Sequence, residues 1–159
     1  MTLEPEGPVC ACGNRGCAEV LASGHAIATA GHRAATAARS SLGPPTSLSI
    51  SPSSDARIVF DEAARGDAVA KAIVDRALAY LGICVANLVT VFDPEIVVVG
   101  GGVAKAGAPV IGAIQAAIRN RCARAVADSC LILPAALGDD SGTLGAAALA
   151  SMSLTASLR

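Results

Sequence analysis

The sequence predicts an α/β fold that is rich in helices and contains a short parallel sheet. Two aliphatic runs suited to buried strands, Glu95–Val99 and Leu131–Leu133, are separated by a segment with helical periodicity. Ala-rich segments with helical spacing precede and follow them. Because the order is helix, strand, helix, strand, helix, we expect the two strands to be parallel and covered by helices.

Composition favours a single globular domain over residues 1–159. The chain is 53% apolar and carries a formal net charge of −1, so it has no basic surface suited to a nucleic acid partner. It contains no Trp, one Tyr and two Phe. The core must therefore be built from small aliphatic side chains, which implies close helix packing.

Sequence features also argue against a membrane or secreted protein. The longest apolar stretch, Leu81–Phe92, falls short of the roughly 20 residues that a membrane span needs, and we interpret it as part of a buried helix. Met1–Pro8 lacks the cationic and apolar regions of a signal peptide. The six cysteines are not spaced as a disulfide framework. We expect a cytoplasmic location.

The N-terminal half of the chain predicts four helices and one connection. The helical pattern of Ala18–Ala38 should break near Gly31 to give two short helices. Ser40–Ser54 is rich in Ser and Pro and predicts an exposed connection. A helix capped by Asp55 or a neighbouring Ser should run to about Ala64. The long helix Ala68–Phe92 becomes apolar all round, so its second half should be central.

The C-terminal half predicts the sheet and its helices. Asp93-Pro94 should end the long helix, because proline lacks an amide donor and restricts the residue before it. Glu95–Val99 then forms a buried strand. Three glycines turn the chain, a helix from about Pro109 to Ala125 leads to the second strand, and a last helix runs from about Ser141 to Ser151.

Three cysteines lie within eight residues in Cys10-Ala11-Cys12-Gly13-Asn14-Arg15-Gly16-Cys17. The two glycines allow tight turns, so the three sulfurs can converge on one tetrahedral ion, for which zinc is the natural candidate. This stretch offers no fourth ligand. The alternative is three reduced cysteines in a loop.

A glycine turn follows the first strand at Gly100-Gly101-Gly102-Val103. Glycines let the backbone approach a ligand closely, and a following helix N-terminus favours an anion. A glycine turn after a strand is nevertheless common in α/β folds, and the spacing is neither a dinucleotide fingerprint nor a phosphate loop. By itself the turn leaves a nucleotide role open.

A third polar stretch, Gly138-Asp139-Asp140-Ser141-Gly142-Thr143, precedes the last helix. Its carboxylates and hydroxyls suit a metal or a phosphate, but Asp and Ser are also ordinary capping residues, and we favour capping. His25 and His32 have no acidic or thiol partner at helical spacing. We interpret both as surface or packing residues and assign them no role.

Together these stretches resemble the ROK family (repressor, open reading frame, kinase), whose C-terminal half carries Cys-x-Cys-Gly-x-x-Gly-Cys-x-Glu and later an apolar strand ending in Gly-Gly-Gly. The fixed positions of the motif are filled by Cys10, Cys12, Gly13, Gly16, Cys17 and Glu19. The resemblance continues through Ala63–Asp67, Asn87–Val103 and Ala136–Leu149.

The resemblance implies the C-terminal lobe of an actin-like, ribonuclease H-like ATPase, truncated because the N-terminal lobe is absent. It assigns zinc to Cys10, Cys12 and Cys17, and relatives add a histidine from a Gly-His pair that would fall immediately before Met1. We therefore hypothesise that an internal methionine was taken as the start or that the gene is truncated.

The resemblance also implies a function, the ATP-dependent phosphorylation of a hexose such as glucose. Glu19 resembles the glutamate that binds sugar hydroxyls, and Gly100–Val103 resembles the turn that receives adenosine. The family's phosphate loop and catalytic aspartate lie in the absent half, so we expect this chain alone to be inactive. The alternative is the sugar-sensing lobe of a transcriptional regulator. Partners would be a hexose, ATP with Mg²⁺ and further copies of the chain.

Overall fold

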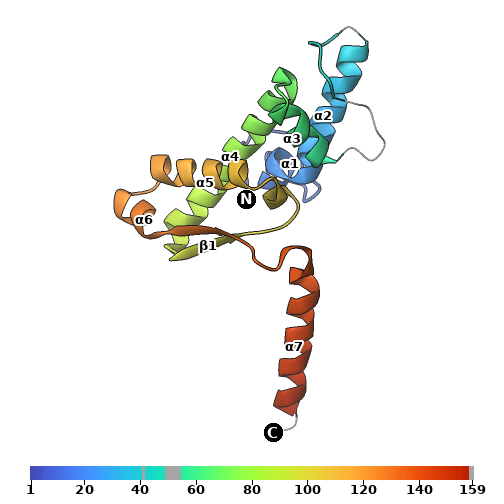
Figure 1. Cartoon of the computed structure of the whole chain (residues 1–159). Coiled ribbons are helices and arrows are strands. Elements are labelled where there is room, and N and C mark those ends of the chain that lie inside the picture. The colour runs from blue at the N-terminus through green and yellow to red at the C-terminus, as the bar shows by residue number, and fades with distance from the viewer. Residues whose placement is uncertain (41, 49–54, 158–159) are drawn as a thin grey trace.

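The computed structural model describes residues 1–40, 42–48 and 55–157 (Figure 1). A loop that holds the cysteine cluster is followed by helices, a two-stranded sheet and a last helix that projects from the rest. The elements in order are α1 (Ala18–Ala22), α2 (Gly24–Arg39), α3 (Ala56–Ala64), α4 (Ala68–Phe92), β1 (Ile96–Val99), η1 (Val103–Ala106), α5 (Ala108–Arg121), α6 (Arg124–Ser129), β2 (Leu131–Pro134), η2 (Gly138–Asp140) and α7 (Ser141–Ser157).

Helix α4 lies at the centre of the packed part and contacts α1, α2, α3 and α5. Its contact with α5 is close because Gly82 is buried there: a Cβ at this position would lie 2.7 Å from the Cβ of Ala117. Val89 on α4 and Ile114 on α5 are fully buried in the same core. Small residues thus let two backbones approach, as the composition predicts.

The prediction of a central second half of α4 is correct for one face only. Ala86 and Val89 are buried, whereas Val91 and Phe92 are 73% and 72% exposed. By length and hydropathy α4 could cross a membrane. Its packing against four other helices is, however, that of the core helix of a folded domain. Asp93 ends it in a left-handed conformation, with φ at 46°, as the Asp-Pro pair predicts.

Strands β1 and β2 pair in parallel, as predicted, with Ile96 opposite Leu131 and Val98 opposite Leu133. The expectation that helices cover the sheet holds for one face. Ile132 and its neighbours pack against the helical core, but the four residues named above are 44% to 63% exposed. The expectation of a fully buried first strand is therefore wrong, because side chains alternate between the faces of a strand.

Two predicted helix boundaries also differ from the structure. The break expected near Gly31 falls at Ser23, whose hydroxyl accepts a bond from the amide of Ala26 at 3.1 Å and caps α2. Gly31 lies inside α2, where a Cβ would approach Val59 of α3 to 2.7 Å. Glycine serves there for helix contact rather than for helix termination. The helix expected to reach Ala125 ends at Arg121 and is followed by α6.

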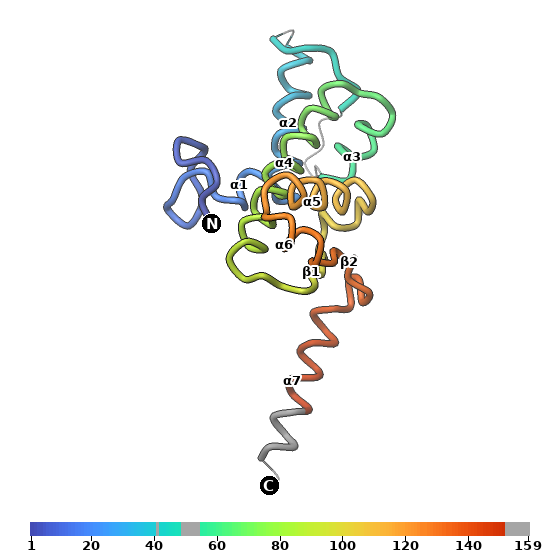
Figure 2. Tube along the Cα trace, turned by 90° about the vertical axis from the view of Figure 1, so that its left-hand side faces the viewer, coloured from blue at the N-terminus to red at the C-terminus, as the bar shows by residue number. Residues whose placement is uncertain are grey.

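Helix α7 is longer than predicted and extends away from the packed part (Figures 1 and 2). Its contacts are chiefly with η2, which directly precedes it. Leu144 and Leu149 are 49% and 69% exposed. Helices that are apolar on all sides are normally buried, so α7 presents an apolar surface that the described residues leave open.

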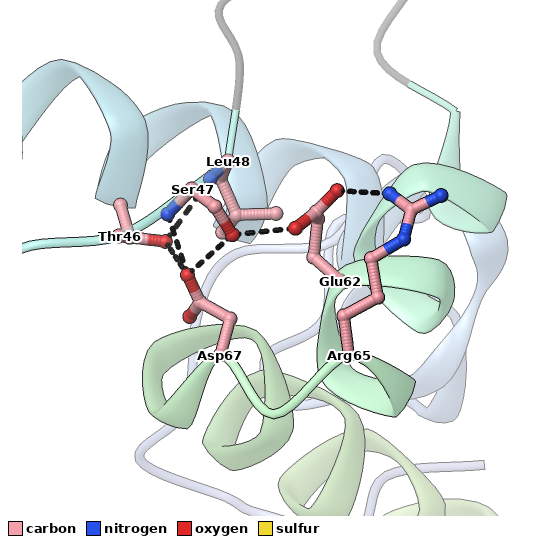
Figure 3. A network of polar contacts seen from close by, with 6 residues as sticks. All are labelled: Thr46, Ser47, Leu48, Glu62, Arg65 and Asp67. Carbon is pink, nitrogen blue, oxygen red and sulfur yellow. Dashed lines mark hydrogen bonds and ion pairs between the residues drawn. The ribbon is translucent and has the colours of Figure 1, made fainter.

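A polar network fixes the junction between α3 and α4 (Figure 3). Asp67 caps α4 by accepting bonds from the amides of Val69 and Ala70, and it also accepts bonds from Thr46 and Ser47 of the connection. Partial burial opposes ionisation of Asp67, but these bonds outweigh it and lower the pKa of its carboxyl group well below the ordinary range.

Most described residues of the connection predicted over Ser40–Ser54 are exposed, but its last described residues pack against the helices. Residues 46–48 are held against α3 and α4, and Leu48 joins the hydrophobic core. Ser47 also donates to Glu62, which pairs with Arg65, and these contacts lower the pKa of Glu62. Residues 41 and 49–54 of the predicted connection lie outside the described residues.

Replacing Asp67 by asparagine should cost about 1–2 kcal/mol of the free energy of unfolding at pH 7, because charged acceptors make the stronger bonds. The native structure depresses the pKa of Asp67 below its unfolded value of about 3.9. Its stabilisation is therefore complete above that pH and disappears as the pH falls through the folded-state pKa. Urea unfolding at neutral and acidic pH measures both effects. Asp75→Asn, at an exposed ion pair, is the control, and an equal loss there would contradict the prediction.

Candidate metal centre and ligand cavities

The three N-terminal cysteines lie in a tight hairpin-like loop. Val9 and Arg15 form an antiparallel bridge at its base. At its tip the amide of Cys10 donates to the carbonyl of Asn14 at 2.7 Å, and the amide of Gly13 donates to the carbonyl of Cys10 at 3.0 Å. The chain reverses within this tip, which brings the sulfur atoms to one side.

The two glycines of the motif, Gly13 and Gly16, are needed for different physical reasons. Both have positive φ angles, 89° for Gly13 and 55° for Gly16, which residues with a side chain rarely adopt. A Cβ at Gly13 would meet open space, whereas one at Gly16 would lie 1.7 Å from the carbonyl oxygen of Glu4. Gly16 is thus required by close packing as well as by its backbone angle.

The three sulfur atoms of Cys10, Cys12 and Cys17 lie within 4.8 Å of one another. Sulfurs around a tetrahedral zinc ion are about 3.8 Å apart, since each Zn–S bond is about 2.3 Å. After a small inward adjustment, the three sulfur atoms could therefore hold one metal ion. Among the described residues, no fourth histidine, cysteine or carboxylate belongs to this group.

The loop supplies an environment for a thiolate. A bond from the backbone of Asn14, with bonds from Cys10 and Cys17, lowers the pKa of Cys12 to about 7. Burial raises the pKa of Cys17, and its two sulfur neighbours add to that effect. One cysteine therefore ionises readily near neutral pH, and a cation would offset the repulsion among all three.

The loop that holds the three cysteines (residues 1–17, the cysteine loop) is anchored to the central helix. Glu4 accepts a hydrogen bond from the hydroxyl of Tyr80 on α4 at 2.9 Å and lies 3.8 Å from Arg76. At the other end, the amide of Ala18 donates to the carbonyl of Met1 at 2.9 Å, and Thr2 bridges with Cys17. Figure 2 shows this loop as a compact unit beside α1.

Glu19, predicted to bind sugar, lies exposed in the first turn of α1, two residues after Cys17. It borders a cavity of about 1040 Å³ formed by the cysteine loop, α1, α2 and α4. Arg33 and Arg76 line the same cavity, which therefore offers one carboxylate and two guanidinium groups as hydrogen-bond partners. The hydroxyl groups of a ligand both donate and accept hydrogen bonds, so they can pair with the carboxylate and with the guanidinium groups.

The predicted nucleotide turn borders a second cavity, of about 980 Å³. Of its four residues, Gly102 lines this cavity, while Val103 packs against the hydrophobic core. Gly101 has a φ angle of 85°, and a Cβ at Gly101 or Gly102 would meet no atom within 4 Å. The turn thus exposes its backbone to open space, as close approach of a ligand requires.

His25 lines both cavities. It lies exposed in the first turn of α2, between the cavity of Glu19 and that of Gly102. Sequence reasoning assigned His25 no role, because its neighbours in space come from α3 and from the turn after β1, far along the chain.

The polar stretch Gly138–Thr143, the third stretch singled out in the sequence, forms η2 and the start of α7. The hydroxyl of Ser141 donates to the carbonyl of Gly138 at 2.7 Å, so in this contact it closes a turn instead of accepting a bond from a helix amide. Asp139 forms an ion pair at 2.7 Å with Lys105, three residues beyond Gly102. The stretch is thereby linked to the glycine turn.

Fold and site together define the C-terminal lobe of an actin-like sugar kinase fold. The chain matches the ROK family over residues 1–153, and it belongs to that family. It is 35% identical over 150 residues to a glucokinase from Thermotoga maritima, covering 94% of this chain and 47% of that protein. The chain thus spans about half the length of the curated relatives it matches.

Solved structures of the family agree. A ROK family glucokinase from Streptomyces griseus in complex with glucose and AMPPNP has a TM-score of 0.74 at 29% identity, covering 94% of this chain and 49% of that one. A ROK family transcriptional regulator, a homolog of the E. coli MLC protein, has a TM-score of 0.68 at 28% identity, covering 84% and 33%. The family therefore includes both kinases and regulators.

Gly16→Ala should disrupt the cysteine loop, whereas Gly13→Ala should lower the free energy of unfolding by only about 1 kcal/mol, because Gly13 has a positive φ angle. The added methyl group at Gly16 would overlap the carbonyl of Glu4 and so displace the Glu4–Tyr80 contact. Fluorescence of Tyr80, the only tyrosine, reports this displacement, and urea unfolding gives the loss of stability. Equal effects of the two substitutions would contradict the role of close packing at Gly16.

Proposed function

We propose that the chain is the C-terminal lobe of an ATP-dependent hexose kinase of the glucokinase type. The observation that carries the proposal is the adjacency of two cavities: one is bordered by Glu19, the other by Gly102, and His25 lines both. A kinase must hold its sugar and its nucleotide side by side so that a phosphoryl group passes directly between them. The similarity to glucokinases supports the same reading.

Glu19 and the glycine turn would bind the substrates, and neither takes part in the phosphoryl transfer itself. Glu19 accepts hydrogen bonds from sugar hydroxyls, and the open backbone around Gly102 receives the adenosine part of ATP. Residues 1–159 contain no Asp-x-Gly-x-Thr phosphate loop, and in the family this loop and the aspartate that takes the proton from the sugar belong to the part that these residues do not span. Without that base and the Mg²⁺-bound phosphates in place, attack on the γ-phosphate is not assisted.

The metal proposed for Cys10, Cys12 and Cys17 is zinc with a structural role. Three thiolates suit zinc, and a fourth ligand would close the site. The histidine expected from the family would directly precede Met1. The bond between Met1 and Ala18 and the Thr2–Cys17 bridge would bring that position close to Cys17. Zinc held there would fix the loop that borders the sugar cavity.

A cytoplasmic location and self-association complete the proposal. The sheet face formed by Ile96, Val98, Leu131 and Leu133 is exposed, and so are the leucines of α7. Apolar surfaces of this kind are normally covered by another part of the protein or by another copy.

The second candidate function is the sugar-sensing lobe of a regulator, which the similarity to the regulator structure favours.

We expect the purified chain to bind about one zinc ion, and Cys17→Ser to abolish this binding, because it removes one of three thiolates. Elemental analysis and native mass spectrometry measure the metal content. Cys84→Ser is the matched control, since Cys84 lies on α4 outside the cluster. A metal-free native chain, or equal loss of zinc in the control, would overturn the metal assignment.

Glucose should bind to the zinc-loaded chain, and Glu19→Gln should weaken this binding about tenfold by removing a charged acceptor. Saturation-transfer NMR detects such binding even when it is weak. Glu6→Gln, an exposed carboxylate of the N-terminal loop, is the control. The same preparation should show no sugar-dependent ATP turnover. Turnover would refute the proposed inactivity, and glucose binding that does not depend on Glu19 would refute the assignment of the sugar cavity.

A further inference from the structure

The cavity that Gly102 lines has a volume suited to a nucleotide and is bordered by charged side chains. Its volume of about 980 Å³ lies within the range of small-molecule sites. Besides His25, its charged side chains are Asp55, Arg57, Asp61 and Lys105. Asp55 is engaged in capping α3, where it accepts a bond from the amide of Arg57 at 3.1 Å. Lys105 lies on η1, two residues after the end of the glycine turn.

Lys105 is held by an ion pair that is easily exchanged. Its ammonium group lies 2.7 Å from Asp139, and the two side chains are 61% and 78% exposed. An ion pair this exposed contributes little to stability. A phosphate group offers more charge and more acceptor oxygens than one carboxylate. A phosphate bound in the cavity could therefore replace Asp139 as the partner of Lys105.

The position of this pair in the fold matches that of ligand sites in parallel sheets. The carboxyl end of β1 leads into Gly100–Gly102 and Lys105, and the carboxyl end of β2 leads into η2 with Asp139. Ligands of parallel α/β sheets bind outside the carboxyl ends of the strands. Lys105 thus connects the proposed nucleotide cavity to η2, from which α7 starts.

We propose that Lys105 binds a phosphate group of a nucleoside di- or triphosphate in this cavity, and that Asp139 holds the ammonium group when the cavity is empty. The inference rests on the proposed function, which places a nucleotide at the glycine turn, and adds the residue that recognises its phosphate. Binding of the phosphate releases Asp139 in η2, the element directly before α7. Nucleotide occupancy is thereby linked to the segment that carries the last helix.

The test compares the affinity of the complete chain for ADP and for adenosine by calorimetry. Lys105→Gln should weaken ADP binding about tenfold, because it removes a charged hydrogen bond. It should leave adenosine binding unchanged, since adenosine has no phosphate. Asp139→Asn should tighten ADP binding about two- to fivefold by freeing Lys105 from its competitor. Lys71→Gln is the matched control, because Lys71 also forms an exposed ion pair, with Asp75, but lies outside the cavity.

The outcomes separate this inference from the proposed function. If the native chain binds neither ADP nor adenosine, the nucleotide site fails and the inference fails with it. If it binds both but Lys105→Gln has no effect on ADP, or lowers adenosine binding equally, the role of Lys105 is refuted while the nucleotide site stands. Weakening by Asp139→Asn or by Lys71→Gln equal to that of Lys105→Gln would also refute it. Circular dichroism confirms that each variant is folded.

Discussion

The close packing of the central helix α4 is the constraint on which the rest of the structure depends. Gly82 allows α5 to approach on one side, and Tyr80 and Arg76 hold the N-terminal loop on another. Asp67 caps its first turn and fastens the connection after α2. With few aromatic side chains in the chain, cohesion must come from many small aliphatic contacts, which require closely fitting backbones.

This packing also places the groups proposed for binding. The cysteine loop is attached to α4 through Glu4, and Glu19 follows directly on α1. The start of α2 lies against the start of α3 and the glycine turn: a Cβ at Gly24 would lie 3.8 Å both from Ala56 and from Val103. The two cavities are therefore neighbours because the starts of α2 and α3 meet the glycine turn, and His25 in the first turn of α2 lines both cavities.

The sequence predicted what depends on local patterns. Helical periodicity located α3 and α4, and the Asp93-Pro94 pair located the end of α4. The spacing of Cys10, Cys12 and Cys17 predicted the convergence of their sulfur atoms. Gly31 was misread as a break because a glycine at a helix contact and a glycine at a helix end look alike in a sequence. Tertiary contacts determine the features that the sequence did not predict. These are the residues that line the cavity at Gly102, the Lys105–Asp139 ion pair and the position of His25 between the two cavities.

The central proposal is that this chain carries sugar- and nucleotide-binding surfaces of a hexose kinase, and that residues 1–159 do not include its catalytic aspartate. The most direct measurement is the nucleotide sequence upstream of the Met1 codon, translated in the same frame. The account predicts codons for Gly-His directly before Met1 and, further upstream, a phosphate loop with a catalytic aspartate. An in-frame stop codon directly before Met1 would instead support the truncated gene, and a helix-turn-helix segment without that loop and aspartate would contradict the account.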